Sequence, residues 1–383
     1  MKPLPLFPVT LVGSWPRPAG LLRALRSKQR GEMSNDAFQK LADEPVIEAL
    51  RHQEAAGIDI VTDGEQRRDN FYSFVAEKLE GVRLMSLAEM LDVSEDKAAF
   101  ERILETLDVP AFSIRTATCT GRIRLREPLA LDEYRFLRQH TARPIKVPLP
   151  GPYLLTRAMW VKEVTRDAYP AKEDLAGDVI RILRQEAFAL RDAGADFIQF
   201  DEPVLAELVF AQGQTRTFMC AALAARRDPR EELEFAVELL NRVTRGLDGV
   251  RTGLHVCRGN WSQKEATLLS GSYRPLVPYL ARMNVQQLVL EYSTPRAGGF
   301  LPVKGKEIGL GVINPRTPED EPVQHILTRV REALRDVPAE KIFLNPDCGF
   351  ATFSSRPMNT AGMASKKVAA MTAAARILRH GGV

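Results

Sequence analysis

Eight short apolar runs, each followed by polar or small residues, constrain the fold of this chain more than any other feature of its sequence. Each run contains four to six residues, mostly Val, Ile, Leu and Phe. This pattern is typical of parallel strands that are buried on both faces. The runs begin at Thr10 (TLVGS), Ile58 (IDIVTDGE), Ile145 (IKVPLPGP), Phe197 (FIQFDEP), Thr252 (TGLHVCRG), Leu288 (LVLEYS), Ile308 (IGLGVINP) and Ile342 (IFLNPDCG).

Helical patterns lie between most of these runs. Alternating strands and helices predict βαβ units with right-handed crossovers, and eight such strands favour a closed α/β fold, the (β/α)8 TIM barrel. An open doubly wound sheet is the competing architecture, but no glycine-rich nucleotide motif follows any run. The expected helices are Ser34–Ala56, Lys172–Ala193, Glu231–Leu247, Glu321–Leu334 and Ser365–Leu378.

The connection between the second and third runs is too long for one helix. We expect residues 69–143 to form an excursion from the barrel, with a helix over Ser94–Leu107 and a small hairpin near Ile114–Leu125. No internal repeat or low-complexity linker divides the chain. We therefore predict one catalytic barrel domain over residues 1–383.

The charge and cysteine content exclude several classes of protein. With 53 basic and 49 acidic residues the net charge is only +4, which argues against nucleic-acid or membrane binding. No signal-peptide pattern and no apolar stretch of about 18 residues is present, so no membrane span is expected. Four cysteines are too few for a disulfide scaffold, and a reducing, cytoplasmic location fits best. The oligomeric state is left open.

Polar and metal-binding side chains follow the apolar runs, at the strand ends that form the active-site face of a barrel. His255 and Cys257 are two positions apart, so they point to the same side, while Glu291 and Cys348 end two other runs. One His, two Cys and an exchangeable carboxylate suit zinc. A lone Cys or His is usually structural, but this combination favours a zinc site. Cys119 and Cys220 lack such a context, and we interpret both as structural.

Three further strand-end residues suggest a substrate site. Glu65 and Asp201 follow apolar runs, and a buried carboxylate needs a partner. That partner is either a barrel Arg or Lys, or the ammonium group of a substrate. Ser14 is either a simple turn residue or, with a nearby backbone amide, a contact for a substrate carboxylate.

At these residues the sequence resembles the catalytic, C-terminal barrel of the cobalamin-independent methionine synthases. The matching segments run in family order from Leu11 to about Arg379. The resemblance implies a (β/α)8 barrel that uses zinc to methylate the thiol of homocysteine, giving methionine. It implies zinc ligands at His255, Cys257, Glu291 and Cys348, a carboxylate contact at Ser14, and ammonium contacts at Glu65 and Asp201. The segments are VGSWPRP, DIVTDGE, LPGPY, IQFDEP, GLHVC, LVLEY, GLGV and NPDCGF.

Departures from the full-length family put the methyl donor in question. The chain resembles the short, single-barrel branch, and its RGNWSQKEATLLSGSY stretch is longer than the corresponding part of the full-length enzymes. Asn314 and Arg316 stand where the family has the Asp-x-His pair thought to protonate the folate nitrogen. Methylcobalamin, or a methylated corrinoid protein, needs no such proton. The donor is therefore a corrinoid or 5-methyltetrahydrofolate, with Asp347 as one candidate for a substitute acid.

Two other functions are compatible with this pattern. The first is zinc-dependent alkyl transfer to another thiol, as in the epoxyalkane:coenzyme M transferases, although that thiol carries a sulfonate and no ammonium. The second is a non-catalytic barrel that zinc only stabilises. A chelator separates these, because removing a structural zinc unfolds the protein.

Overall fold

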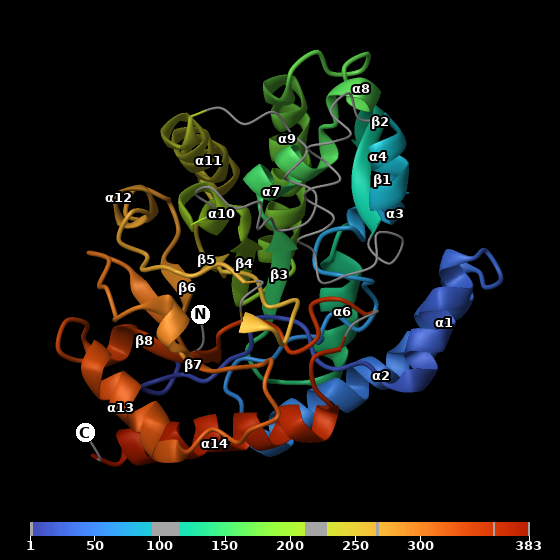
Figure 1. Ribbon diagram of the computed structural model, residues 1–383. Helices are drawn as coiled ribbons and strands as arrows, with labels where there is room; N and C mark the ends of the chain where they lie inside the picture. Colours follow the sequence, from blue (N-terminus) through green and yellow to red (C-terminus); the bar gives the residue numbers. More distant parts are fainter. Residues whose placement is uncertain (1–2, 94–114, 211–227, 266–267, 355–356, 382–383) are drawn as a thin grey trace.

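A central sheet of six parallel strands forms the middle of the fold, with strand order β3-β4-β5-β6-β7-β8 (Figure 1). The computed structural model describes residues 3–93, 115–210, 228–265, 268–354 and 357–381. Six of the eight apolar runs are confirmed as strands, and their order follows the chain. The strands are β3 (Lys146–Pro150), β4 (Phe197–Asp201), β5 (Arg251–Val256), β6 (Gln287–Glu291), β7 (Glu307–Ile313) and β8 (Ile342–Pro346).

The first two apolar runs form single parallel bridges rather than strands. Bridges join Val9 to Leu344, Thr10 to Ile60 and Val61 to Ile145. One reason for the short pairing is that the Val9 N–H donates to the Asp59 carboxylate at 2.8 Å instead of to a neighbouring strand. The bridges lie between β8 and β3, so backbone pairing continues from one edge of the six-stranded sheet to the other.

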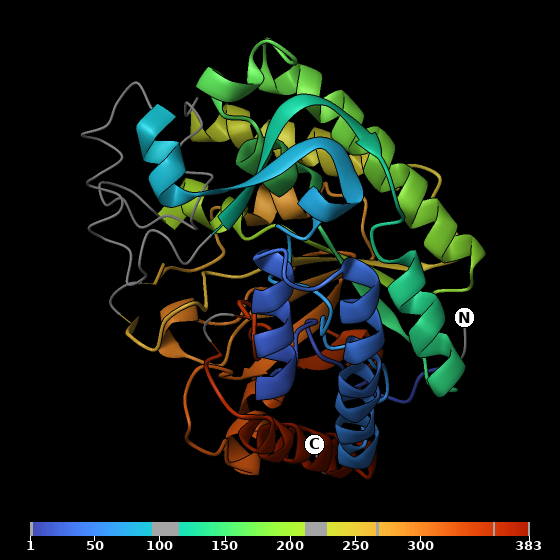
Figure 2. The same ribbon diagram turned by 90° about the vertical axis from the view of Figure 1, so that its right-hand side faces the viewer.

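Five long helices lie outside the central strands, as Figures 1 and 2 show. All five expected helices are confirmed, with ends shifted by a few residues. In α2 the Ser34 hydroxyl accepts from the N–H of Ala37 at 3.2 Å, and the helix ends at Gly57, whose φ of 85° suits glycine. The long helices are α2 (Asn35–Ala56), α9 (Lys172–Asp192), α11 (Pro229–Thr244), α13 (Val323–Ala333) and α14 (Ala361–Arg379).

The other helices outside residues 69–143 were not expected from the sequence, although α1 is as long as α13. They are α1 (Ala19–Gln29), α7 (Pro152–Met159), α8 (Lys162–Thr165), α10 (Val204–Phe210), α12 (Val277–Leu280) and the 3-10 turns η2 (Pro295–Ala297) and η3 (Ala339–Lys341). Most are single turns or two turns long, which leaves little periodic signal to detect. None of the helices in the described ranges is long and apolar enough to cross a membrane.

Residues 69–143 carry a separate two-stranded antiparallel sheet. The hairpin expected near Ile114–Leu125 was wrong, because β2 (Arg115–Leu125) is one continuous strand that pairs with β1 (Leu79–Ser86). The helix expected over Ser94–Leu107 lies outside the described residues, as does Cys220. Cys119 is buried in β2, where its thiol donates to the Gly121 carbonyl at 2.9 Å. The same segment contains α3 (Val75–Lys78), α4 (Leu87–Val93) and α6 (Leu131–His140).

Candidate metal centre and cavity

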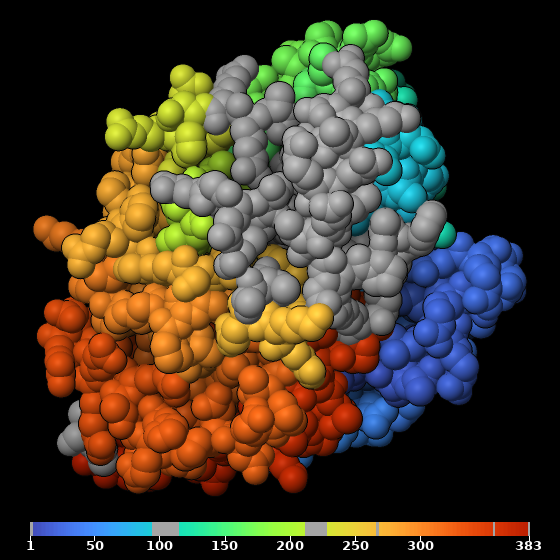
Figure 3. Space-filling view, in the orientation of Figure 1, coloured from blue at the N-terminus to red at the C-terminus, as the bar shows by residue number. Residues whose placement is uncertain are grey.

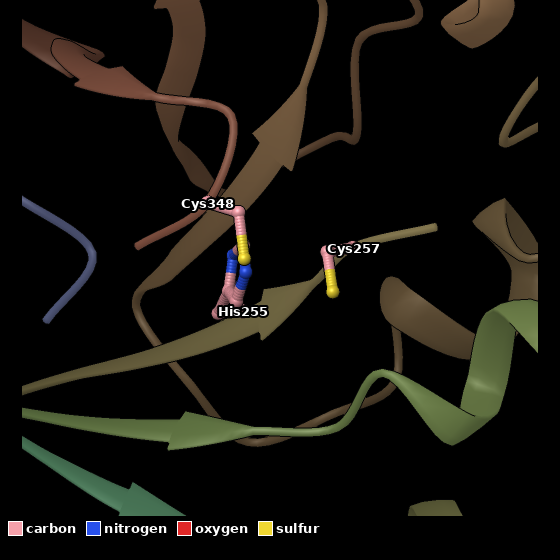
Figure 4. Close-up of side chains that lie close together, drawn as sticks. All are labelled: His255, Cys257 and Cys348. Atoms are coloured by element: carbon pink, nitrogen blue, oxygen red, sulfur yellow. The ribbon is translucent and has the colours of Figure 1, made fainter. Parts of the chain in front are cut away.

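Three of the four expected metal ligands lie together at the carboxyl ends of the strands. One ligand atom from each of His255, Cys257 and Cys348 lies within 4.8 Å of the other two (Figure 4). His255 lies in β5, Cys257 directly follows that strand, and Cys348 follows β8. All three side chains are buried. The fold therefore brings together residues about 90 positions apart in the sequence, at a spacing that one metal ion can bridge.

The imidazole of His255 is oriented for a metal. Its Nδ1 lies 3.0 Å from the Val289 carbonyl oxygen, which can only accept, so Nδ1 carries a proton. Its Nε2 is buried, and Cys348 is the group that interacts with it. Figure 4 shows the ring beside the sulfur of Cys348. A backbone carbonyl that fixes the outer nitrogen of a histidine is the usual support for a metal ligand.

The two thiols differ in acidity. Hydrogen bonding from Cys257 and His255 holds the pKa of Cys348 well below its usual range, whereas the bond to Cys348 and burial raise that of Cys257. Burial lowers the pKa of His255, but the hydrogen bond and charge of Cys348 outweigh it and raise that pKa to about 9. Without a metal, these shifts favour negative charge on the Cys348 sulfur and positive charge on the His255 ring. A divalent cation would replace that positive charge, and the donor set of one nitrogen and two sulfurs fits zinc.

Glu291, the fourth expected ligand, lies outside the group of atoms within 4.8 Å of one another. It ends β6 and is buried. Its Oε2 accepts from Arg258 Nη1 at 3.3 Å and lies 3.6 Å from Arg296 Nη2, and its Oε1 accepts from the Asn260 amide. Arg258, Asn260 and Arg296 were not identified from the sequence as site residues. Arg258 and Asn260 lie in the long segment after Cys257 that the sequence singled out, whereas Arg296 lies in the segment after Glu291.

A cavity of about 390 Å³, a volume that includes its open mouth, adjoins the metal cluster. All three expected substrate contacts line it together with the three clustered ligands, whereas Glu291 and Asp347 do not. The sequence had not indicated its apolar wall. The lining residues are Val12, Ser14, Glu65, Phe71, Asp201, Pro203, His255, Cys257, Asn260, Cys348, Gly349 and Thr352.

The two cavity carboxyl groups have no full counter-charge. Burial raises the pKa of Glu65 to about 8 and that of Asp201 to about 6. Glu65 Oε2 has no hydrogen-bond partner among the described residues, while Asp201 Oδ1 accepts from Gln199 Nε2 at 2.8 Å. Glu65 also has a φ of 52°, which strains a non-glycine backbone. Buried carboxyl groups of this kind are suited to binding a cation, because a positive charge nearby favours their ionised form.

Close backbone approach fixes two of these side chains. A Cβ atom at Gly13 would lie 2.1 Å from Glu65 Oε1, and one at Gly349 would lie 2.1 Å from Ser14 Oγ. A larger residue at either position would therefore require the Glu65 or Ser14 side chain to move. Ser14 Oγ accepts from the N–H of Ala351 at 3.2 Å, so its own proton remains available to a ligand.

The side chains at the positions considered for a proton donor form hydrogen bonds with other parts of the protein. Asp347 is buried, and one carboxylate oxygen accepts from the N–H groups of Tyr292 and Ser293, each at 3.0 Å. Burial raises the pKa of Asp347 to about 7. The Arg316 guanidinium donates to Asn260 Oδ1 at 3.0 Å. Asn314 Oδ1 accepts from the N–H of Arg316 at 3.1 Å.

Comparisons with known proteins place these observations in a family. The model of the catalytic domain of cobalamin-independent synthases matches residues 7–376. A methionine synthase of Pyrococcus abyssi is 29% identical over 380 residues, covering 98% of this chain and 94% of its own. One of Thermococcus kodakarensis is 29% identical, covering 92% and 89%. A B12-independent methionine synthase from Shewanella, solved with selenomethionine, has a TM-score of 0.73 at 24% identity and covers 98% of each chain, which supports the fold.

Proposed function

The chain belongs to the family of cobalamin-independent methionine synthase catalytic domains, and from this premise we propose that it is a zinc-dependent methyltransferase. The acceptor is the thiol of homocysteine and the product is methionine. The observation that carries this proposal is the cluster of His255, Cys257 and Cys348 in a cavity that also holds two carboxyl groups, neither of which forms an ion pair with an arginine or lysine among the described residues. A metal that binds a thiol, beside an acidic pocket that binds an ammonium group, suits an amino acid that carries a thiol.

The proposed fold is a single (β/α)8 barrel over residues 1–383, with residues 69–143 as an excursion. The parallel bridges at Val9, Thr10 and Val61 support it, because they continue the pairing of six strands through two more segments. The metal ligands then lie at the carboxyl ends of the strands, which form the active-site face of such barrels.

Zinc would be held by His255, Cys257 and Cys348, with Glu291 as an exchangeable fourth ligand. When bound, the metal supplies positive charge that lowers the pKa of a substrate thiol and keeps it as a thiolate at neutral pH. The protein contributes orientation and exclusion of water. Val289 fixes the imidazole, and the walls of the cavity hold the acceptor beside the metal cluster.

The amino-acid end of the substrate would bind opposite the metal. Asp201 and Glu65 take the ammonium group, since its charge compensates the burial that raises both pKa values. Ser14 donates its free hydroxyl proton to the carboxylate. These contacts favour homocysteine over a sulfonate thiol such as coenzyme M, which has no ammonium to occupy the acidic pocket. They also argue against a purely structural zinc.

The choice of methyl donor depends on whether a side chain can protonate the leaving group. A guanidinium is not a general acid near neutral pH, and an amide such as that of Asn314 does not titrate. Asp347 already accepts two backbone hydrogen bonds outside the cavity lining. We therefore favour methylcobalamin or a methylated corrinoid protein over 5-methyltetrahydrofolate, because a corrinoid leaves without protonation.

A donor and acceptor screen tests the proposal. Zinc-loaded protein is incubated with homocysteine or coenzyme M and with methylcobalamin or methyltetrahydrofolate, and the methylated thiol is quantified. Methionine formed from homocysteine is the expected result. Methylation of coenzyme M alone would favour the alternative transferase, and no product with any pair would contradict a methyltransferase function.

A further inference from the structure

A lysine interrupts the apolar run that forms β3, and its side chain leads towards the substrate end of the cavity. Lys146 Nζ donates to Gln199 Oε1 at 3.2 Å, and Gln199 Nε2 donates to Asp201 Oδ1 at 2.8 Å. We propose that Lys146 and Gln199 are positioning residues that make the cavity selective for a thiol on an α-amino acid. They hold the ammonium contact, Asp201, at a set distance from the carboxylate contact, Ser14. This inference rests on the proposed function and deepens it.

The strands place the three side chains in one line. Side chains alternate along a strand, so Gln199 and Asp201 lie on the same face of β4. Gln199 is in register with Pro148, two positions beyond Lys146 in β3, so the lysine side chain runs towards the carboxyl end of the sheet. Lys146 and Gln199 are fully buried, so neither reaches the surface that Figure 3 shows, and neither lines the cavity. They therefore act on a substrate only through the groups that they hold.

The amide of Gln199 has only one orientation that satisfies its neighbours. Its Nε2 donates to Asp201 at 2.8 Å and to the Val12 carbonyl at 2.9 Å. A backbone carbonyl only accepts, so the NH2 group faces this side and Oε1 faces Lys146. Both N–H groups and the oxygen of the amide are thus used. One nitrogen atom joins the strand end that carries Asp201 to the segment that leads to Ser14.

The segment that carries Ser14 has little backbone pairing to hold it, because it forms single parallel bridges rather than a continuous strand. Side chains hold the carbonyl groups that follow those bridges. Lys146 Nζ donates to the Leu11 carbonyl at 2.7 Å, and Gln199 donates to the next carbonyl along the chain. The position of Ser14 relative to Asp201 therefore depends in part on these two side chains.

Lysine is a costly residue for this place. Its Nζ lies 4.8 Å from the centre of the Phe197 ring, and this ring and the two hydrogen-bond acceptors are all neutral partners. Burial lowers the pKa of Lys146 to about 7, against the charge of Asp201, which raises it. A buried amine needs hydrogen-bond partners, whereas methionine would fill a similar space without that requirement. Packing alone therefore does not account for a lysine here, whereas the carbonyl and the amide that it holds do.

Lys146→Met and Gln199→Met remove the hydrogen bonds and keep apolar side chains of similar length. The zinc-loaded full chain is titrated by calorimetry with L-homocysteine and with 4-mercaptobutyrate, which lacks the ammonium group. Gln199→Met should weaken homocysteine binding roughly ten-fold, the typical value of one hydrogen bond to a charged group, and Lys146→Met roughly two- to ten-fold. Binding of 4-mercaptobutyrate should change less, because this thiol has no ammonium group for Asp201 to bind.

Gln287→Met and Lys306→Met are the matched controls. Gln287 is a buried glutamine in β6 whose amide donates to Glu307 Oε2 at 3.5 Å, and Lys306 donates to the Val285 carbonyl at 2.8 Å. Neither residue lines the cavity. Both control variants should therefore bind the two thiols as the wild-type protein does.

The double variant tests whether the two residues act through one chain of hydrogen bonds. In the Gln199→Met background, Lys146→Met should weaken homocysteine binding by a smaller factor than it does alone. Lys146→Met keeps Gln199 in place, so it decides the question if Gln199→Met does not fold.

Three results would overturn the positioning role. They are equal losses for both thiols, unchanged homocysteine affinity in the single variants at an unchanged melting temperature, and fully additive losses in the double variant. Absence of homocysteine binding to the zinc-loaded wild-type protein would instead contradict the proposed function.

Discussion

The role of Asp201 in binding the substrate ammonium is open to a direct test with Asp201→Asn. Burial raises the pKa of this carboxyl to about 6, so near pH 7.5 it carries the negative charge of the pocket, while Glu65, with a pKa of about 8, is largely protonated. Losing a hydrogen bond to a charged group costs roughly 1.5–3 kcal/mol, or about 10- to 150-fold in affinity. The Michaelis constant for homocysteine should rise by that factor, with zinc content unchanged.

A substrate without the amino group provides the control for this variant. The Michaelis constant for 4-mercaptobutyrate, which keeps the thiol and the carboxylate, should hardly change on Asp201→Asn. In the wild-type protein the affinity for homocysteine should fall as the pH drops through about 6, because Asp201 becomes protonated there. The variant should lack this step. Equal losses for both thiols would refute the ammonium contact and point to a structural role.

Stability gives an independent check on the same residue. The pKa of Asp201 in the folded protein lies above its ordinary value of 3.8, so the folded state is favoured at low pH and loses this contribution as the pH rises toward 6. Above that pH the buried charge destabilises the metal-free protein by an amount on the order of 3 kcal/mol. Asp201→Asn should therefore leave the melting temperature unchanged or raise it at pH 8, which thermal unfolding measures.

Three further predictions concern the metal, the donor and the cavity. Cys348→Ser should lose zinc, since a neutral hydroxyl is a poor ligand, whereas Glu291→Gln should retain it. Elemental analysis measures the zinc content of both proteins. Full zinc occupancy in Cys348→Ser would exclude this residue from the site. Methylcobalamin should exceed methyltetrahydrofolate in initial rate, because a missing general acid costs about 10²- to 10⁴-fold; a faster reaction with the folate would make Asp347 the next residue to mutate. Gly13→Ala places a Cβ 2.1 Å from Glu65 Oε1 and should raise the Michaelis constant for homocysteine with zinc intact; unchanged kinetics would mean that the Glu65 side chain can move aside.

The fold was predictable where the sequence signal is local. Apolar runs and helical periodicity located six central strands and five long helices, because burial on both faces and amphipathic spacing are properties of neighbouring residues. The partner of β2 was not predictable in this way, since β1 lies some 30 residues earlier and carries no turn signal linking the two. The short pairing at Val9 depends on the Asp59 carboxylate, a contact between residues 50 positions apart.

The candidate site was likewise predictable only where the sequence signal is local. Motif chemistry singled out His255, Cys257 and Cys348 as candidate ligands, because few residue types bind zinc and all three lie at the ends of apolar runs. The position of the Glu291 carboxylate was not accessible from the sequence. It depends on where the Arg258 and Arg296 side chains lie, and an arginine in a polar loop is ordinarily a surface residue.

The way Ser14 is joined to the residues after Cys348 affects how the protein matures. The Ser14 carbonyl accepts from the N–H of Phe350 at 3.0 Å, and its hydroxyl accepts from Ala351, 337 positions later. During synthesis neither the substrate pocket nor the three-residue metal cluster can form until the segment carrying Cys348 has left the ribosome. A nascent chain thus has no complete site for the proposed zinc ion, and binding of that ion would be a late step that depends on closure of the fold.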